Sequence, residues 1–251
     1  MLTDAVALVT GGSGGLGSQI CSCLAEKGVD IAVGYYEGEH RATATKRKVE
    51  ELGRKAVTVQ IDQTCPTSVH EAIERVVSEL GGLDILVNNA GMAMGGHDVP
   101  LGDLEAFTPE IWDEMMAVNV RGPYLVARAA SSHLRTSKWG RIVNIGSTIG
   151  HGDWYADRPF YPSKAAVVPL TRFLAASLAP DVTVNCVSPG LMAETPMGSG
   201  GPQSFYEVWK DRSALGVTTS VADVAGQVAF FCETSSITGQ SVVVDGGINF
   251  H

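Results

Sequence analysis

Short apolar runs rich in β-branched residues alternate along this chain with longer stretches in which apolar positions recur every three or four residues. The first pattern is typical of buried strands and the second of amphipathic helices. The expected strands lie at residues 5–10, 30–35, 56–61, 83–88, 140–146, 182–187 and 240–244. The expected helices lie at about 15–28, 40–53, 67–80, 110–137, 160–179 and 221–233. Because alternating strands and helices form right-handed βαβ units, the pattern predicts a seven-stranded parallel sheet with helices on both faces.

A single doubly wound α/β domain accounts for all 251 residues, because no long linker, repeat or low-complexity tract interrupts the alternation. Two segments, 92–109 and 191–219, break the rhythm, and each follows a strand. Open α/β sheets bind ligands at the carboxyl ends of their strands. Both segments are therefore interpreted as loops over a ligand site, with 191–219 as a lid. The alternative is that they are surface irregularities.

The charge balance argues against a nucleic-acid partner. The formal net charge is −9 and the isoelectric point is near 5.1. The short basic group 46–48 is offset by Glu50 and Glu51, so it is interpreted as a solvated helix face. With 45% hydrophobic and 18% charged residues, the composition is that of an ordinary globular domain.

The cysteines and the apolar segments bear on the compartment. The five cysteines are scattered without the paired spacing of a metal site, so reduced thiols are expected and no metal site is predicted. No apolar stretch approaches the ~18 residues of a membrane span, and residues 5–10 enter a strand without a signal-peptide pattern. These features favour a cytoplasmic protein with no membrane partner.

A glycine-rich loop lies between the first expected strand and the first expected helix. Glycines allow a tight turn and close approach of the backbone to a pyrophosphate, whose charge is favoured by the helix N-terminus. The strand before the loop and the helix after it strengthen this interpretation. The residues expected to bind the nucleotide here are Thr10, Gly11, Ser13, Gly15, Leu16 and Gly17.

A second constellation centres on Phe160. Lys164 follows it by four residues, which places both side chains on one face of a helix, and Ser147 precedes it by thirteen residues. This frame resembles the Ser…Tyr-x-x-x-Lys signature of the short-chain dehydrogenase/reductase family, with Phe160 at the tyrosine position. The family uses that tyrosine as proton donor or acceptor, and phenylalanine has no hydroxyl.

The resemblance extends through most of the chain and is strongest to the 3-oxoacyl-carrier-protein-reductase-like members. The glycine loop has the family's Thr-Gly-x-x-x-Gly-x-Gly spacing. Further motifs follow in the family's order: Asp62, Asn88-Asn89-Ala90-Gly91, Asn119, Asn144-Ile145-Gly146-Ser147, Ser188-Pro189-Gly190, Ile237-Thr238-Gly239-Gln240 and Val244-Asp245-Gly246-Gly247. The resemblance implies a single Rossmann-type domain, with a nucleotide-binding part at about 1–145 and a catalytic and substrate part at about 146–251.

The family's chemistry assigns expected roles to the catalytic positions. Hydride moves between the nicotinamide and a carbonyl carbon, Ser147 is expected to hydrogen-bond the oxyanion, Lys164 to bind the ribose, and Asn119 to hold a water of the proton relay. With Phe160 in place of tyrosine, carbonyl reduction is expected to be impaired. Tyr161 would project about 100° away on a helix, so it is not expected to substitute.

Other side chains were weighed as the missing acid. His151 has a suitable intrinsic pKa for proton transfer, and Tyr155 is close in the sequence. For both, the preferred interpretation is a residue that lines the cleft. Enoyl-reducing relatives use a wider tyrosine–lysine spacing, which would place their tyrosine at position 157. That residue is Asp157, so this variant of the signature is absent.

Cofactor choice turns on the end of the second strand. NAD-binding relatives place an acid there to hold the ribose, and that position is Tyr35. His40 and Arg41 are candidates for a 2′-phosphate, although Glu37 and Glu39 would repel it; the alternative is that they begin a solvated helix. NADP(H) is favoured over NAD(H). The resemblance implies further cofactor contacts at Tyr35, Asp62, Gln63, Asn88, Ala90, Gly91, Lys164, Pro189, Gly190, Met192 and Thr195, the last displaced by one residue from the family pattern.

Three functions remain open. The first is an NADP(H)-dependent carbonyl reductase or alcohol dehydrogenase, acting on a ketone or secondary alcohol, whose tyrosine has been replaced, with engineering as one origin of the replacement. The second is a natural member that reduces an imine or catalyses a cofactor-assisted non-redox step, and the third is a catalytically silent nucleotide-binding protein. The resemblance also implies a homotetramer or homodimer through helices 110–137 and 160–179. An apolar substrate pocket or the core accounts for Met92, Met94, Trp154, Phe205, Tyr206 and Trp209.

Overall fold

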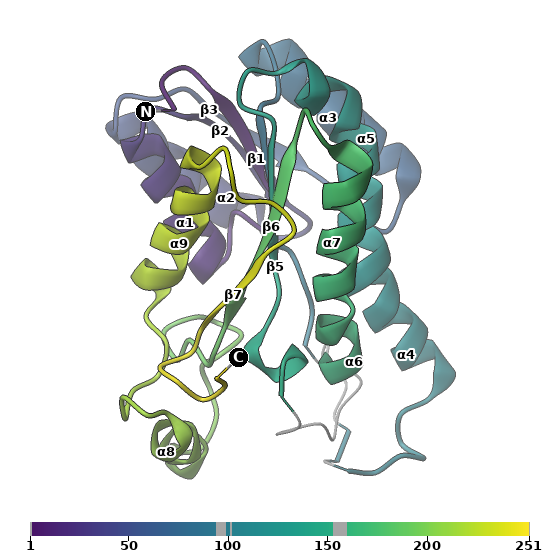
Figure 1. The fold of residues 1–251 in the computed structure, drawn as a ribbon, viewed down its shortest axis with the longest axis vertical. Helices are drawn as coiled ribbons and strands as arrows, with labels where there is room; N and C mark the ends of the chain where they lie inside the picture. The colour runs from purple at the N-terminus through teal and green to yellow at the C-terminus, as the bar shows by residue number, and fades with distance from the viewer. Residues whose placement is uncertain (1, 94–98, 101, 153–159, 251) are drawn as a thin grey trace.

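A central parallel sheet organises the computed structural model, which describes residues 2–93, 99–100, 102–152 and 160–250. Its seven strands have the order β3-β2-β1-β4-β5-β6-β7, and every neighbouring pair is parallel (Figure 1). The strands are β1 Val6–Val9, β2 Asp30–Tyr35, β3 Ala56–Gln60, β4 Ile85–Asn88, β5 Arg141–Ile145, β6 Thr183–Pro189 and β7 Ser241–Val244. The order reverses between β1 and β4, as in a doubly wound Rossmann-type fold, so the predicted fold class is confirmed.

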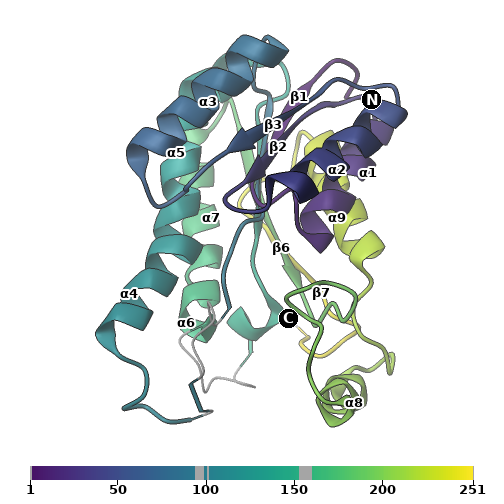
Figure 2. The same ribbon diagram turned by 180° about the vertical axis from the view of Figure 1, so that it is seen from behind.

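Helices cover both faces of the sheet. Helices α1, α2 and α9 lie on one face and α3, α5 and α7 on the other, which Figure 2 shows from behind. The helices are α1 Gly15–Glu26, α2 Glu39–Glu51, α3 Pro66–Leu80, α4 Pro109–Met116, α5 Gly122–Thr136, α6 Phe160–Ala165, α7 Val167–Leu178, α8 Gln203–Arg212 and α9 Val221–Glu233. Within the described part of the chain, no helix is both long enough and apolar enough to cross a membrane.

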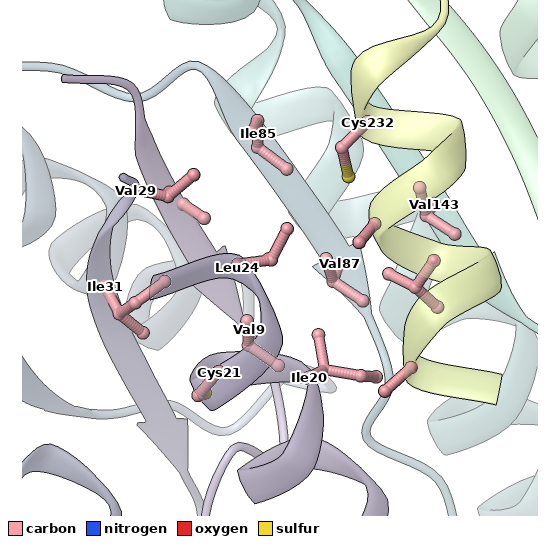
Figure 3. Packing of buried hydrophobic residues seen from close by; sticks show 14 of the residues in the cluster. Val9, Ile20, Cys21, Leu24, Val29, Ile31, Ile85, Val87, Val143 and Cys232 are labelled. Atoms are coloured by element: carbon pink, nitrogen blue, oxygen red, sulfur yellow. The ribbon is translucent and has the colours of Figure 1, made fainter. Parts of the chain in front are cut away.

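Two apolar layers form the core, one on each side of the sheet. Side chains alternate along a strand, so Ala7 and Val9 of β1 pack towards α1 and α9, while Val6 and Leu8 pack towards α3 and α5. Figure 3 shows the first layer, in which Val9 and Val87 meet Ile20. Because both faces are covered, all residues of β1 and β4 are buried, as expected for interior parallel strands.

Two expected long helices are interrupted. The expected helix 110–137 consists of α4, a π-helical turn η1 (Ala117–Arg121), and α5. The expected helix 160–179 is divided into α6 and α7 at Ala166. Pro123 and Pro169 lie one to three residues into the following helices, and a proline supplies no N–H to the turn before it. Both interruptions lie at the carboxyl ends of the strands, beside the expected reaction site.

The segment 191–219 contains a helix that pattern analysis did not predict. Helix α8 lies beyond the carboxyl ends of the strands, at the same end of the molecule as α6 (Figure 1). Its aromatic residues contact one another: the Phe205 ring centroid lies 5.6 Å from that of Tyr206 and 6.3 Å from that of Trp209. Trp209 is buried, so part of this segment has a small apolar core of its own.

Candidate active site

The loop between β1 and α1 has the geometry of an anion-binding turn. Gly11 has a left-handed φ of 63°, and the Gly14 N–H donates to the Gly11 carbonyl at 3.1 Å. A Cβ at Gly17 would overlap that same carbonyl oxygen, so only glycine fits there. No side chain caps the N-terminus of α1, so its first N–H groups remain available to a phosphate. These residues therefore fit a nucleotide pyrophosphate.

Thr10 and Asn89 join this loop to the end of β4. Thr10 Oγ1 accepts hydrogen bonds from the N–H groups of Asn89 (3.1 Å) and Ala90 (3.0 Å). Asn89 Nδ2 donates to the carbonyls of Thr10 (2.9 Å) and Gly11 (3.1 Å). The two halves of the expected cofactor site are thereby fixed to each other. Sequence analysis placed Asn89 in a motif but gave it no role of its own.

The end of β2 carries no acidic side chain toward this loop. Tyr35 ends the strand and is buried. Gly38 has a left-handed φ of 78°, and a Cβ there would lie 2.7 Å from an Arg41 guanidinium nitrogen, so the Arg41 side chain folds back over the turn. Arg41 forms no ion pair with any described residue, Glu37 and Glu39 included.

Asp62 and Asn88 have partners within the protein. Asp62 Oδ1 accepts from the Thr64 N–H (2.8 Å) and hydroxyl (2.7 Å), which shapes the turn after β3. Asn88 Nδ2 donates to Asn144 Oδ1 at 2.9 Å and to the Pro123 carbonyl at 3.3 Å in the interior. The Asn88 side chain therefore braces β4 against β5, and a contact with nucleotide is open only to its backbone.

Asn119 and Lys164 converge on Gly91. A Cβ at Gly91 would lie 3.0 Å from Asn119 Oδ1 and 3.4 Å from Lys164 Nζ. Asn119 is held in place by the Met92 backbone, whose N–H donates to Oδ1 at 2.9 Å and whose carbonyl accepts from Nδ2 at 2.8 Å. Asn119 Nδ2 also donates to Ser163 Oγ at 3.0 Å. The structure thus brings the predicted asparagine and lysine together.

Lys164 is buried and carries its amine into the site. Nζ donates to the Ile145 carbonyl at 2.9 Å, and it lies 5.8 Å from the centroid of the Phe160 ring. Burial lowers the pKa of Lys164 to about 8. The two side chains share one helix face, and no hydroxyl stands at position 160.

The buried lysine predicts a pH dependence of stability. Between pH 8 and 10.5 the unfolded chain binds the Lys164 proton and the folded chain does not, so the lysine's contribution to the free energy of unfolding rises across this window. For a pKa shift of this size, the free energy of unfolding rises by about 3 kcal/mol across the window. Below pH 8 the destabilisation from burying the charged amine is fully present. In Lys164→Met this rise is expected to disappear.

Urea unfolding of Lys164→Met and of the unmodified chain at pH 7 and pH 10 measures this rise. The other titrating groups are common to both proteins, so their contributions cancel when the two pH dependences are subtracted. The exposed Lys138, which lies 5.1 Å from the Trp139 ring, provides the control Lys138→Met. An equal pH dependence in Lys164→Met and the unmodified chain would contradict the prediction.

Ser147 stands at the end of β5, directly before the short helix η2 (Thr148–Gly150). It is partly exposed, and its hydroxyl makes no hydrogen bond to the described residues. Its backbone is extended, with φ −163° and ψ 149°. The hydroxyl is therefore available to a ligand in the site.

His151 points towards β6 and β7. Its Nε2 lies 2.8 Å from Ser188 Oγ and 3.2 Å from Ser241 Oγ. This nitrogen is engaged by two hydroxyls, which weakens the case for His151 as the replacement acid. The other candidate in this segment, Tyr155, lies outside the described residues, as do Asp157, Met94 and Trp154.

The segment after β7 contacts η2, a contact that the motif Val244-Asp245-Gly246-Gly247 did not predict. The buried Asp245 carboxylate accepts from Thr148 Oγ1 (2.5 Å) and from the N–H groups of Gly247 (2.9 Å), Ile248 (3.1 Å) and Asn249 (3.0 Å). Asn249 Nδ2 donates to the Thr148 carbonyl at 3.2 Å. We call this set the Asp245 clamp. It fixes the backbone that immediately follows Ser147.

The turn after β6 lies against the glycine loop. Thr195 Oγ1 donates to the Met192 carbonyl at 2.9 Å and accepts from the Gly198 N–H at 3.1 Å. A Cβ at Gly15 would lie 3.1 Å from Thr195 Cγ2, so this turn packs directly on the start of α1. Gly190 packs as tightly: its Cβ would lie 2.5 Å from Thr219 Oγ1. The predicted residues from Pro189 to Thr195 thus border the loop.

Comparison with known proteins finds relatives that match this chain over almost its whole length. The sequence profile described as Enoyl-(Acyl carrier protein) reductase matches residues 11–249. The short-chain dehydrogenase/reductase FrzI of Cladobotryum sp. is 37% identical, covering 98% of this chain and 96% of that protein. The 3-oxoacyl-[acyl-carrier-protein] reductase FabG of Aquifex aeolicus is 32% identical, covering 98% of both. A short chain dehydrogenase from Burkholderia cenocepacia, solved in complex with NADP, is 37% identical, covers 99% of both chains and has a TM-score of 0.90.

Proposed function

The chain belongs to the short-chain dehydrogenase/reductase family of oxidoreductases, and we propose that it is an NADP(H)-dependent enzyme that reduces a ketone or oxidises the corresponding secondary alcohol without a side-chain acid at position 160. One observation carries the proposal. Asn119 and Lys164 converge on Gly91, and Lys164 Nζ lies 5.8 Å from the centroid of the Phe160 ring, which carries no hydroxyl. Nucleotide binding and lysine placement are retained, and proton donation is not.

Different residues of this chain would bind the cofactor and stabilise the substrate. NADPH supplies the hydride when bound. The glycine loop and the first turn of α1 would hold the pyrophosphate, and the Lys164 amine would be available to the ribose. Ser147 Oγ is available to hydrogen-bond the substrate oxygen, on which negative charge develops. Without a hydroxyl at position 160, the proton for that oxygen comes from water, which slows carbonyl reduction.

Preference for NADP(H) is proposed from the end of β2. Tyr35 offers no carboxylate to a ribose, and the Arg41 guanidinium lies over the Gly38 turn without an ion-pair partner among the described residues. A 2′-phosphate there would meet the positive charge of this exposed guanidinium. The NADP complex of the Burkholderia cenocepacia relative agrees with this choice.

Arg41→Ala is expected to weaken NADPH binding about tenfold and leave NADH binding unchanged. Only NADPH carries the 2′-phosphate, so only NADPH loses a hydrogen bond between charged groups when Arg41 is removed. Calorimetric titration with both cofactors measures this. Arg47→Ala, an exposed arginine on the same helix, is the control. Equal weakening of both cofactors would assign Arg41 to the fold instead of to the phosphate.

The proposed function is tested with the unmodified chain. NADPH oxidation is followed with a panel of ketones and β-ketoesters, and NADP+ reduction with the matching alcohols. Slow turnover of a ketone with NADPH supports the proposal. Tight NADPH binding without turnover of any carbonyl or imine would support the silent nucleotide-binding alternative, and absence of NADPH binding would overturn the proposal.

A second candidate is reduction of an imine. An iminium carbon that receives hydride leaves a neutral amine, so no proton donor at position 160 is needed, and the phenyl ring of Phe160 fits that requirement. Turnover of cyclic imines that exceeds turnover of every ketone would favour this candidate.

The assembly and compartment are also proposals. Exposed aromatic side chains on the outer helices, Trp112, Tyr124 and Phe173, suit a homotetramer or homodimer built through α4, α5 and α7. The cysteines are free thiols in the structure, which suits the cytoplasm.

A further inference from the structure

The side chain of Gln63 is buried beneath the π-helical turn η1. Its Nε2 donates to the Val118 carbonyl at 2.8 Å and to the Ala90 carbonyl at 3.3 Å. Both partners are acceptors, so the amide can be oriented in only one way, with Nε2 towards them. Oε1 then faces away, buried and without a hydrogen-bond partner in the described structure. Both hydrogen bonds that the Gln63 amide donates therefore go to the backbone around η1.

The Val118 carbonyl needs this external donor. In an α-helix its partner would be the N–H of Gly122, but that N–H donates to the Ala117 carbonyl in the π register. The π register would assign the N–H of residue 123 to Val118, and residue 123 is proline. A buried carbonyl without a partner is costly. The Gln63 amide supplies the hydrogen bond that the helix cannot.

Gly122 makes room for this arrangement. A Cβ at Gly122 would lie 2.7 Å from Gln63 Cγ, so any larger residue would push the glutamine away from η1. Gln63, Gly122 and Pro123 are therefore matched to one another. The proline lacks the N–H that Val118 would use, and the glycine leaves space beside η1. The Gln63 side chain occupies that space and donates to the Val118 carbonyl.

Asn119 lies inside the turn that Gln63 holds. It follows Val118 directly, and its amide reaches the Met92 backbone and Ser163 Oγ. A turn that changed from the π to the α register would rotate Asn119 about the helix axis. The asparagine would then leave Gly91 and Lys164.

We propose that Gln63 is a positioning residue, which holds η1 in the π register and so keeps Asn119 beside Lys164. This inference rests on the proposed reductase function and deepens it. It gives the Gln63 side chain a task other than the nucleotide contact that the family resemblance implies. It also connects the turn after β3, at the nucleotide end of the cleft, to the reaction site.

Gln63→Met keeps the length of the side chain and removes its donors. We expect kcat for NADPH-dependent reduction to fall about tenfold or more, while KM and the NADPH dissociation constant stay within about twofold. Pro123→Ala in the same chain restores an N–H that can reach Val118, so Gln63→Met/Pro123→Ala is expected to recover most of the lost kcat. Gln60→Met, an exposed glutamine of β3, is the control.

Amide hydrogen exchange gives a readout that needs no turnover. In Gln63→Met the amides of residues 117–122 are expected to exchange about tenfold faster, and in the double variant at the original rate. If the unmodified chain reduces nothing, the proposed function fails while this measurement still tests Gln63. Unchanged exchange, a rise in the NADPH dissociation constant with kcat unchanged, or a loss of folding that Pro123→Ala does not restore would each overturn the inference.

Discussion

Replacing Phe160 by tyrosine is expected to raise kcat/KM for ketone reduction by about 10²–10⁴, equivalent to ~3–5 kcal/mol of transition-state stabilisation. Lys164 Nζ already lies 5.8 Å from the centre of the ring, buried and on the same helix face. A phenol hydroxyl at this position would have a cation nearby to favour its ionised form. Steady-state kinetics with NADPH and the ketone panel measure the gain.

Controls separate the hydroxyl from the ring. Tyr161→Phe removes the neighbouring hydroxyl and should leave the rate unchanged, because residue 161 lies about 100° around the helix. Phe160→Leu tests the ring without adding an acid and should give no gain. An unchanged rate in Phe160→Tyr, together with turnover of an imine by the unmodified chain, would decide in favour of the imine-reducing alternative.

Breaking the Asp245 clamp should give the second large effect. Asp245→Ala leaves the N–H groups of Gly247, Ile248 and Asn249 and the Thr148 hydroxyl without their acceptor. Because these groups are partly or fully buried, the free energy of unfolding should fall by about 3 kcal/mol or more. Urea unfolding monitored by circular dichroism measures the loss.

The same variant should also impair the site, because the clamp fixes the residue after Ser147. At a temperature where Asp245→Ala remains folded, kcat/KM is expected to drop about tenfold or more while NADPH binding persists. Asp113→Ala, an exposed aspartate of α4, removes an identical side chain and is the matched control. A loss of stability no greater than in that control would mean that the clamp contributes little.

Strand and helix patterns were sufficient for the fold. The alternation of buried β-rich runs with amphipathic stretches predicted the parallel sheet, and the order of motifs predicted its class. Helix boundaries were less accurate where a proline acts on the preceding turn. Pro123 lies within the expected helix 110–137, and a proline inside a helical pattern indicates a break. The spacing did not show that the break would be a π turn around Asn119.

Side-chain direction explains the rest of the difference. Gln63 is expected at the nucleotide because of its place after β3, yet it turns under η1 because Gly122 leaves space there. Asn88 turns inward and donates to Asn144 Oδ1. The Asp245 clamp joins residues that are 97 positions apart, and no local pattern reports such a contact.

That separation has a consequence for how the protein is made. A ribosome adds about 5–20 residues per second, so Thr148 waits roughly 5–20 seconds after its own synthesis before Asp245 exists. During that interval β1 to β5 and their helices have already emerged and can begin to pack. A nascent chain can thus form its glycine loop well before the backbone beside Ser147 is fixed. A chain cut short before Asp245 would keep the glycine loop and lose the acceptor that fixes the backbone after Ser147.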